Sequence, residues 1–129
     1  MPEEKKTNQI SPSSASRLLH PKLTVLLTCA DKAGKANIIT LAWTMPVSMH
    51  PSLLAVSIAP RRHSYKLIQE TKDFVINIPT MKFVKEALFC GRRSGRDVDK
   101  FKQTKLTPLP AKTVKAPIIK ECVAHLECK

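Results

Sequence analysis

Hydrogen-bond donors gather at residues 61–64, where two arginines, a histidine and a serine follow a short apolar segment. Ser64 is a residue type that commonly caps the N-terminus of a helix. A helix N-terminus offers unpaired backbone N–H groups and about half a positive charge, so anions bind there readily. Arg61 and Arg62 add the two-pronged geometry with which guanidinium groups match phosphate oxygens. These residues could therefore bind a phosphate group, and Ser57 could turn toward the same point.

A second interpretation of this cluster needs no ligand. Arg61 and Arg62 would then be solvated loop residues, and Ser64 would only cap the helix. One electrostatic argument favours the site, because the helix dipole repels cations at its N-terminus and a bound anion would remove that conflict. Trp43, the only tryptophan, is open to two interpretations as well: it is either a core residue or the wall of a pocket for an aromatic ligand.

Length, charge and glycine content limit the class of protein. The chain has 129 residues, 43% of them hydrophobic, which is enough for one domain with a core. Its formal net charge of +12 attracts anions, including nucleic acids, anionic lipid and phosphorylated metabolites. No apolar run approaches the roughly 20 residues that a membrane helix requires. The three glycines form no Gly-x-Gly-x-x-Gly motif, which argues against a dinucleotide fold of the usual kind.

Neither the cysteines nor the histidines are spaced as in a metal site. The four cysteines show no Cys-x-x-Cys motif, so we expect four reduced thiols in a cytoplasmic protein. No Ser-His-acid arrangement or carboxylate pair stands out, and we assign no catalytic acid or base. Residues 1–19 are polar, lack the apolar stretch of a signal peptide, and are expected to be flexible. The folded domain is predicted over residues 20–129.

Short strands dominate the expected secondary structure. Four segments are apolar and rich in β-branched residues and are expected to be strands: residues 22–30, 36–43, 53–58 and 73–78. Asp31 and Gly34 suit a tight turn between the first two, which predicts a β-hairpin. The stretch after Trp43 is predicted to be a loop. The last segment, residues 121–129, alternates apolar and polar side chains, which predicts a strand with one apolar face. This pattern favours a small barrel or sandwich.

Two short helices are expected among these strands. The first is predicted over residues 64–71, with Ser64 as its N-cap, because apolar residues follow the serine at spacings of three and four. The second is predicted over residues 81–89 and is expected to be closed by Gly91 in the usual C-terminal position. A polar loop should follow over residues 92–101.

Four motifs follow one another in a fixed order along the chain. They are an Asn-x-x-Thr-x-Ala-Trp strand, a Pro-x-Leu strand that leads into Arg-His-Ser, a Phe-Val-Ile-Asn-Ile strand, and a Ser-Gly-x-Asp-Val-Asp-Lys-Phe loop. Together they resemble the flavin reductase-like, FMN-binding split-barrel family, the group that includes flavoredoxin. The resemblance extends from about His20 to Lys129, and the linked order of the motifs makes it far more specific than any one of them.

The resemblance implies a mainly β fold, an FMN-binding split β-barrel of Greek-key topology with two short inserted helices. It implies a homodimer with FMN near the subunit interface. It further implies a flavin-dependent oxidoreductase or electron-transfer protein, similar to NAD(P)H:flavin reductases, with a reduced nicotinamide or a redox protein as electron donor. The isoalloxazine ring would carry the hydride or electrons, and the protein would supply placement and electrostatics.

The same resemblance assigns residues to the cofactor. The turn before the first helix would hold the phosphate, the loop after the second strand would contact the ring system, and the loop at residues 90–95 would close over the cofactor. Asn37 would contact the ribityl chain or the ring edge. The complete set is Asn37, Ala42, Trp43, Thr44, Met45, Ser57, Ile58, Ala59, Arg61, Arg62, His63, Ser64, Ser94, Gly95 and Lys100.

The sequence departs from the family pattern at its end. The family usually continues for several tens of residues, including a Gly-Asp-His stretch near the flavin, and no such stretch occurs here. Two other functions therefore stay open. A non-catalytic FMN-binding remnant would bind FMN without turnover, and a basic nucleic-acid-binding module would lose affinity steeply with salt. The aromatic content of 5% and the scattered basic residues count against the nucleic-acid module.

Overall fold

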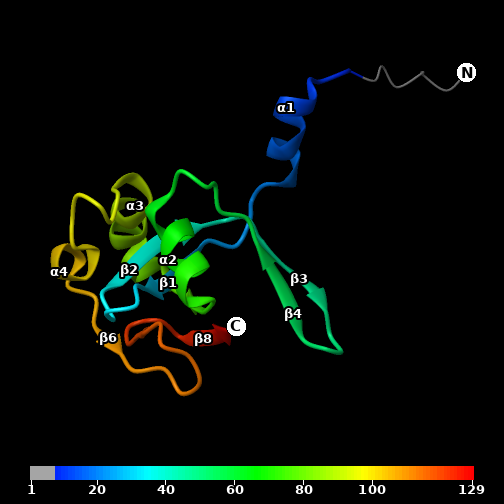
Figure 1. The fold of residues 1–129 in the computed structure, drawn as a ribbon. Coiled ribbons are helices and arrows are strands. Elements are labelled where there is room, and N and C mark those ends of the chain that lie inside the picture. The colour runs from blue at the N-terminus through cyan, green and yellow to red at the C-terminus, as the bar shows by residue number, and fades with distance from the viewer. Residues whose placement is uncertain (1–7) are drawn as a thin grey trace, which may run out of the picture.

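A four-stranded antiparallel sheet forms the centre of the fold (Figure 1). The computed structural model describes residues 8–129. The strand order is β2-β1-β5-β8, and the bounds are β1 Val25–Ala30, β2 Ala36–Leu41, β5 Phe74–Ile78 and β8 Ala124–Cys128. Two further antiparallel pairs stand apart from this sheet: β3 (Thr44–Ser48) with β4 (Leu53–Val56), and β6 (Pro108–Leu109) with β7 (Ile118–Ile119). The sheets of the described residues do not close into a barrel.

The first two strands form the predicted hairpin. Val25 lies opposite Leu41 at one end, and the turn closes the other end. The Lys35 N–H donates to Asp31 Oδ1 at 2.8 Å, and Gly34 has a φ of +88°, a left-handed conformation that glycine adopts without strain. The turn residues expected from the sequence therefore act as predicted.

Strand β1 is buried on both faces, and each face supports a separate apolar cluster. Successive side chains of a strand point to opposite faces, so alternate residues of β1 enter different clusters. The cluster on the first face contains Val25, Leu27, Cys29, Ile39, Leu41, Leu67 and Ile76. The cluster on the second face contains Leu26, Ile38, Ala87, Cys90, Leu106, Ile119 and Cys122. The central strand therefore holds the two halves of the core together.

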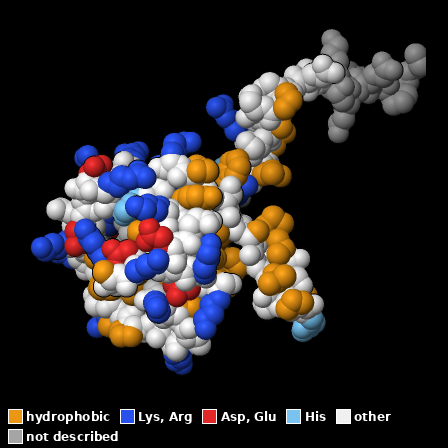
Figure 2. Space-filling view, viewed as in Figure 1, with side chains coloured by type: hydrophobic (Ala, Val, Ile, Leu, Met, Phe, Trp, Pro, Cys, Tyr) orange, Lys and Arg blue, Asp and Glu red, His pale blue; other side chains and the backbone are white. Residues whose placement is uncertain are grey.

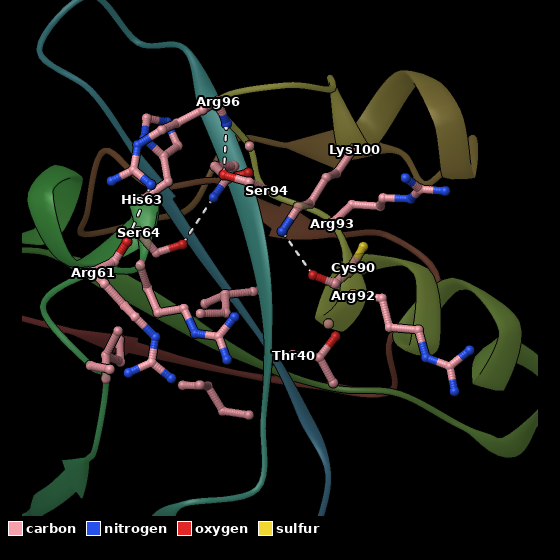
Figure 3. A pocket seen from close by; sticks show the side chains of 18 of the residues that line it. Thr40, Arg61, His63, Ser64, Cys90, Arg92, Arg93, Ser94, Arg96 and Lys100 are labelled. Atoms are coloured by element: carbon pink, nitrogen blue, oxygen red, sulfur yellow. Dashed lines mark hydrogen bonds between the residues drawn. The ribbon is translucent and has the colours of Figure 1, made fainter.

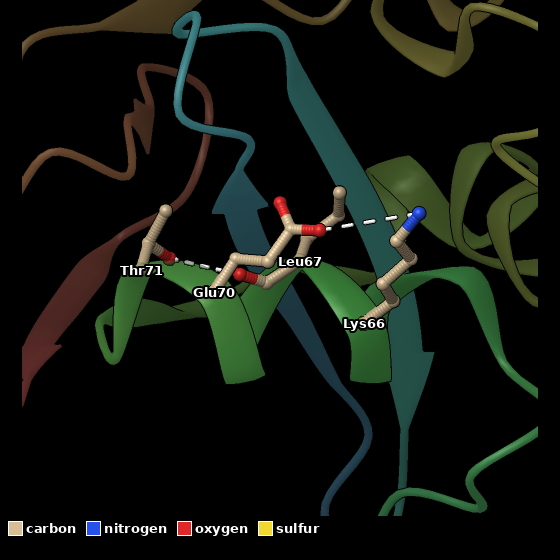
Figure 4. A network of polar contacts seen from close by, with 4 residues as sticks. All are labelled: Lys66, Leu67, Glu70 and Thr71. Carbon is tan, nitrogen blue, oxygen red and sulfur yellow. Dashed lines mark hydrogen bonds and ion pairs between the residues drawn. The ribbon is translucent and has the colours of Figure 1, made fainter.

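Helix α2 (His63–Thr71) covers the first face, where its Leu67 is buried. Its outer side carries a Lys66–Glu70 ion pair at 3.9 Å, and Thr71 Oγ1 donates to the Leu67 carbonyl (Figure 4). The helix was predicted one residue later, with Ser64 as its cap, and that assignment of the cap is wrong. Arg62 occupies the N-cap position without a side-chain hydrogen bond.

The second face is covered by the turn η2 (Met81–Phe83), helix α3 (Val84–Arg92) and helix α4 (Lys100–Thr104). Gly91 does not close α3 as predicted, because it lies inside the helix. A Cβ at Gly91 would lie 3.4 Å from Thr40 Cβ, so the glycine allows α3 to approach β2 closely. The helix ends instead at Arg92, and the C-cap residue Arg93 has an extended backbone. Helix α4 begins at the end of the segment that was predicted to be a loop.

The stretch after Trp43 was predicted to be a loop, but it forms β3 and pairs with β4. This hairpin projects from the body of the protein and is mostly hydrophobic on the side shown in Figure 2, whereas Lys and Arg side chains are gathered on the body. Its exposed apolar residues are Met45, Val47, Met49 and Leu53. A two-stranded ribbon of this kind has little independent stability in water.

The N-terminal segment extends away from the body (Figure 1). It contains the short helix α1 (Pro12–Ala15) and the 3₁₀ turn η1 (Ser16–Leu19), and neither buries a residue. The flexibility expected for residues 1–19 concerns in part residues 1–7, which lie outside the described residues. Within residues 8–129, each helix is too short or too polar to cross a membrane.

Candidate functional site

A cavity of about 720 Å³ opens where the end of β2, the N-terminus of α2 and the segment after α3 meet. All the residues assigned to the cofactor from the sequence line this cavity except Thr44 and Met45. These two residues belong to β3 and line a second hollow of about 920 Å³, which lies between the hairpin and the sheet and is also lined by Leu126 and Cys128 of β8. The first volume is within the range of small-molecule sites.

The N-terminus of α2 forms one wall of the cavity (Figure 3). The backbone N–H groups of His63 and Ser64 lie in the first turn, where a helix provides no acceptor, so they are available to a ligand. The Ser57 N–H donates to the Trp43 carbonyl at 2.9 Å, and this contact keeps the end of the β2 segment beside the entry to the helix. Trp43 and the helix terminus therefore line the same cavity.

Asn37, Ser64 and Gly95 form a fixed contact at the bottom of this wall. Asn37 Nδ2 donates to Ser64 Oγ at 2.9 Å, and both side chains are buried, Ser64 to 2% exposure. A Cβ at Gly95 would overlap Asn37 Oδ1 and would lie 2.9 Å from His63 Cδ2. The Ser64 oxygen accepts in this bond, so the bond does not use the Ser64 O–H as a donor. The assignment of that hydroxyl to the phosphate stays a prediction.

His63 lies between the helix terminus and the segment after α3. Burial lowers the pKa of its imidazole below the ordinary 6.5, and the nearby charges of Arg96 and Lys100 lower it further. Arg96 is held beside it, because its Nη1 donates to the Arg61 carbonyl at 3.2 Å. A histidine with a lowered pKa is neutral at pH 7 and becomes charged readily when an anion binds next to it.

Lys100 is a buried cation in the cavity wall, only 4% exposed. Its Nζ donates to the carbonyls of Ile38 and Cys90, each at 2.7 Å, and burial lowers its pKa. An ammonium group has three donors, so one N–H remains for another acceptor. In residues 8–129, no carboxylate oxygen lies within 4 Å of this nitrogen. Burial without an acidic partner favours the neutral amine, and an anionic ligand next to this nitrogen would favour its charged form.

None of the four cysteines is in a disulfide, and Cys29, Cys90 and Cys122 are buried. Burial raises the pKa of each of these three thiols to about 11. They are therefore protonated at neutral pH and poor nucleophiles, although Cys90 lines the cavity. Their role in this structure is packing, as members of the two apolar clusters.

The cavity is strongly cationic. Besides Lys100 it is lined by five arginines: Arg61, Arg62, Arg92, Arg93 and Arg96. The single ion pair of residues 8–129 joins Lys66 to Glu70, so none of these arginines has a carboxylate partner within 4 Å there. From the sequence, Arg92 and Arg93 were included only as part of the loop at residues 90–95, and Arg96 was not assigned to the site. The signal that could have found them is the density of arginine in the segment "GRRSGR", next to the glycine that packs on Asn37.

Comparison with known proteins places the chain in a family. Residues 16–129 match the model of the flavin reductase like domain. An uncharacterised protein of Archaeoglobus fulgidus is 38% identical over 111 residues, which cover 86% of this chain and 62% of that protein. The structure of flavoredoxin from Desulfovibrio vulgaris (Miyazaki F) superposes with a TM-score of 0.80 at 28% identity, covering 98% of this chain and 65% of that one.

A third similar protein is the FMN-binding domain of a flavin reductases-like enzyme from Shewanella baltica. It superposes with a TM-score of 0.78 at 26% identity, covering 93% of this chain and 63% of that one. The chain thus spans between 62% and 65% of the length of these three proteins. The family match and the motif order agree, and the chain belongs to the flavin reductase-like family. The resemblance predicted from the sequence is confirmed.

Proposed function

We propose that the protein binds FMN in the cationic cavity and acts as a flavin-dependent oxidoreductase or electron-transfer protein. One observation carries the proposal: the free N–H groups of a helix N-terminus, the Arg61–Arg62 pair and the aromatic residue Trp43 line the same cavity. These are the groups that a phosphate tail and an aromatic ring require. The similar domain from Shewanella baltica is FMN-binding, which supports the choice of ligand.

The donor set fits a phosphate-bearing ligand. Arg61 and Arg62 would hold the phosphate together with the N–H groups of His63 and Ser64. Ala42 and Trp43 would contact the ring system, and residues 94–95 would form the wall opposite the helix. When bound, FMN supplies the redox chemistry by accepting two electrons and a proton at its ring. Lys100 would place its third N–H on an acceptor atom of the cofactor, since the other two N–H groups are held by carbonyls.

We also propose that the protein is a homodimer and that the β3–β4 hairpin contributes to its interface. The hairpin carries Met45, Val47, Met49 and Leu53 in exposed positions, and contiguous apolar surface of this kind is typical of protein–protein contacts. Thr44 and Met45 lie on this hairpin rather than in the cavity. A second copy that packs on the hairpin would cover the cavity mouth near Trp43.

Two other functions are separated from this proposal by simple observations. A non-catalytic flavin-binding protein would bind FMN but would not be reduced by any nicotinamide or redox protein. A nucleic-acid-binding module would bind single-stranded DNA with a steep salt dependence and would take up no FMN. The observation that favours the nucleic-acid-binding module is the net charge of +12, and this charge equally suits a phosphorylated cofactor.

The test begins with the absorbance spectrum of the purified protein, alone and after addition of FMN. We expect a bound flavin spectrum and release of FMN on denaturation. The double variant Arg61→Ala/Arg62→Ala should bind FMN at least roughly 100-fold more weakly, since each charge-assisted bond contributes about 1.5–3 kcal/mol. The control Lys82→Ala/Lys85→Ala removes the same charge from exposed positions outside the cavity and should bind as the parent does. A protein that takes up no FMN contradicts the proposal.

A further inference from the structure

The side chain of Trp43 is held less firmly than its backbone. The Trp43 carbonyl accepts a hydrogen bond from the Ser57 N–H at 2.9 Å, which fixes the main chain at this point. The indole, however, is 54% exposed and belongs to neither apolar cluster. Exposed side chains change rotamer on a timescale of nanoseconds or less. The orientation of the indole therefore depends on the contacts that its ring makes with neighbouring side chains.

Lys22 supplies a contact of this kind. Its Nζ lies 5.2 Å from the centre of the Trp43 ring, within the roughly 6 Å at which the face of an indole attracts a cation. Lys22 is half-buried, whereas Pro21 and Leu23 on either side of it are exposed. In the described part of the chain, the one ion pair involves other residues, so no carboxylate within 4 Å competes for this ammonium group. The charge of Lys22 is therefore directed to the ring.

The pairing of β1 with β2 brings these two residues together. Val25, the first residue of β1, lies opposite Leu41, the last residue of β2. Because the two strands are antiparallel, the residues just before β1 lie beside the residues just after β2. Lys22 precedes Val25 by three positions, and Trp43 follows Leu41 by two. In Figure 1 the N-terminal segment and the β3–β4 hairpin leave the body close to each other at this point. The contact therefore follows from the register of two buried strands.

We infer that Lys22 is a positioning residue, whose ammonium group holds the Trp43 indole in the orientation against which the flavin ring packs. This inference rests on the proposed function, in which the ring system of FMN contacts Trp43. An indole has two faces, and the face next to Lys22 is taken by the cation, so the flavin contacts the other face or the edge. Lys22 acts through the indole and not on the phosphate, in contrast to Arg61 and Arg62. It lies outside the four family motifs.

The experiment compares the affinities for FMN and for riboflavin, which has the ring but no phosphate, in the variant Lys22→Met. Methionine nearly keeps the length of the side chain and removes its charge. We expect both affinities to fall by the same factor, about two- to fivefold, which is the size of an exposed cation–π contact. Lys22→Arg returns a cation to the ring and should restore both affinities. The control Lys32→Met removes one charge from the turn at the other end of the β1–β2 hairpin, outside both cavities, and should bind as the parent does.

A second measurement needs no flavin. The protein has one tryptophan, so its indole N–H gives a single signal in a ¹⁵N-correlated NMR spectrum. Relaxation of this signal reports motion of the ring on the picosecond-to-nanosecond timescale. We expect a lower order parameter for the indole in free Lys22→Met than in the free parent, and the parent value in Lys22→Arg and Lys32→Met.

Each outcome decides the inference. Unchanged affinities in Lys22→Met overturn it, and so does a loss confined to FMN, because Lys22 would then act on the phosphate. Tighter binding of both flavins also overturns it, since Lys22 would then cover the face that the ring needs. A lower melting temperature with an unchanged indole order parameter would leave Lys22 a stabilising role only. A parent protein that binds no FMN fails the proposed function instead, and the order parameter in the free protein still shows whether Lys22 holds the indole.

Discussion

The polar groups at the bottom of the cavity hold one another in place. Asn37 donates to Ser64, Gly95 packs against Asn37, and Arg96 donates to the carbonyl of Arg61. Preorganised contacts of this kind keep a binding wall in one shape before the ligand arrives. We therefore expect that substitutions of these residues in the cavity wall change the affinity for FMN, even where the substituted residue does not itself contact the ligand.

We predict that Gly95→Ala weakens FMN binding. The new methyl group would overlap Asn37 Oδ1 and lie 2.6 Å from Asn37 Cγ, so the segment around residue 95 must move away from α2. Overpacking of this kind typically costs about 1–3 kcal/mol, which corresponds to roughly a five- to hundredfold loss of affinity if the strain is expressed in the bound state. Fluorescence titration with FMN measures the effect.

The matched control is Gly91→Ala, which adds the same methyl group to the same cavity wall. There the methyl carbon would lie 3.4 Å from Thr40 Cβ, a contact that a slight adjustment relieves. We expect its FMN affinity to stay close to that of the parent. Equal affinities in both variants would show that Gly95 does not shape the site.

A second prediction concerns the protonation of His63. Burial and the charges of Arg96 and Lys100 lower its pKa below 6.5, so the folded protein disfavours the proton and loses stability as the pH falls below that value. A phosphate placed nearby favours the charged imidazole and should raise the pKa. NMR titration of the histidine side chains should show a midpoint below 6.5 in the free protein and a higher midpoint with FMN. Riboflavin, which lacks the phosphate, should leave it unchanged, and an unchanged midpoint with FMN would place the phosphate elsewhere.

At the residue scale, the sequence predicted the identity of much of the cavity wall but not the roles within it. The family motifs indicated Asn37 and Ser64, but not that Asn37 donates to Ser64 Oγ, a contact between residues 27 positions apart in the chain. The sequence also lacked any local signal for Lys100 as a buried cation, because its partners are backbone carbonyls of Ile38 and Cys90, far from it in the chain. Pairings of this kind depend on the tertiary fold.

At the scale of elements, the β3–β4 hairpin has the fewest stabilising contacts with the rest of the single chain. It pairs only within itself among the described strands, and its apolar side chains are exposed. The sequence analysis missed β3 because Pro46 and several polar residues interrupt the expected pattern. Strands with a complete apolar pattern, such as β1 and β5, were predicted to within three residues. An apolar sequence pattern predicts strands that are buried within a single chain, such as β1. The pattern does not predict β3, because most of its residues are exposed in the single chain.

We predict that Met49→Lys disrupts self-association. Met49 is 82% exposed near the tip of the hairpin, so the substitution should leave the fold of one chain intact. In a dimer that buries the hairpin, the new charge would be desolvated without a partner, which costs several kcal/mol. Light scattering after size-exclusion chromatography should show a dimer for the parent and a monomer for the variant.

Met81→Lys is the control for this experiment, because Met81 is 81% exposed on η2 at a different place in the fold. It should remain dimeric. A parent protein that is monomeric at high concentration, or a Met49→Lys variant that stays dimeric, would show that the hairpin is not the interface.

At the scale of the whole molecule, charge and core are separated. The two apolar clusters meet on β1, whereas Lys and Arg side chains are spread over the surface of the body on the face shown in Figure 2, and five arginines line the cavity. The composition of the sequence revealed the surplus of +12 but not its location, since the basic residues are spread along the chain. Folding brings Arg61 and Arg62 to the same cavity as Arg92 and Arg93.

We predict that FMN stabilises the whole protein against heat. A ligand at 100 times its Kd adds about 2.7 kcal/mol to the free energy of unfolding. For a domain of this size, that corresponds to a rise in Tm of roughly 10 °C. Differential scanning fluorimetry or calorimetry measures the rise. Riboflavin at the same concentration should give a much smaller rise, because it lacks the phosphate that the arginines would bind, and equal shifts would contradict the assignment of the phosphate.

The single indole stands where the cavity, the hairpin and the N-terminal segment meet. Trp43 is 54% exposed, its carbonyl is bound to Ser57, and Lys22 Nζ lies 5.2 Å from the centre of its ring. Its emission is therefore a built-in optical reporter of this junction, with no second tryptophan to obscure the signal. An oxidised flavin bound nearby would quench this emission, whereas exclusion of water from the indole would shift it to shorter wavelength. One emission spectrum could therefore follow both the binding of FMN and the burial of the β3–β4 hairpin in the same sample.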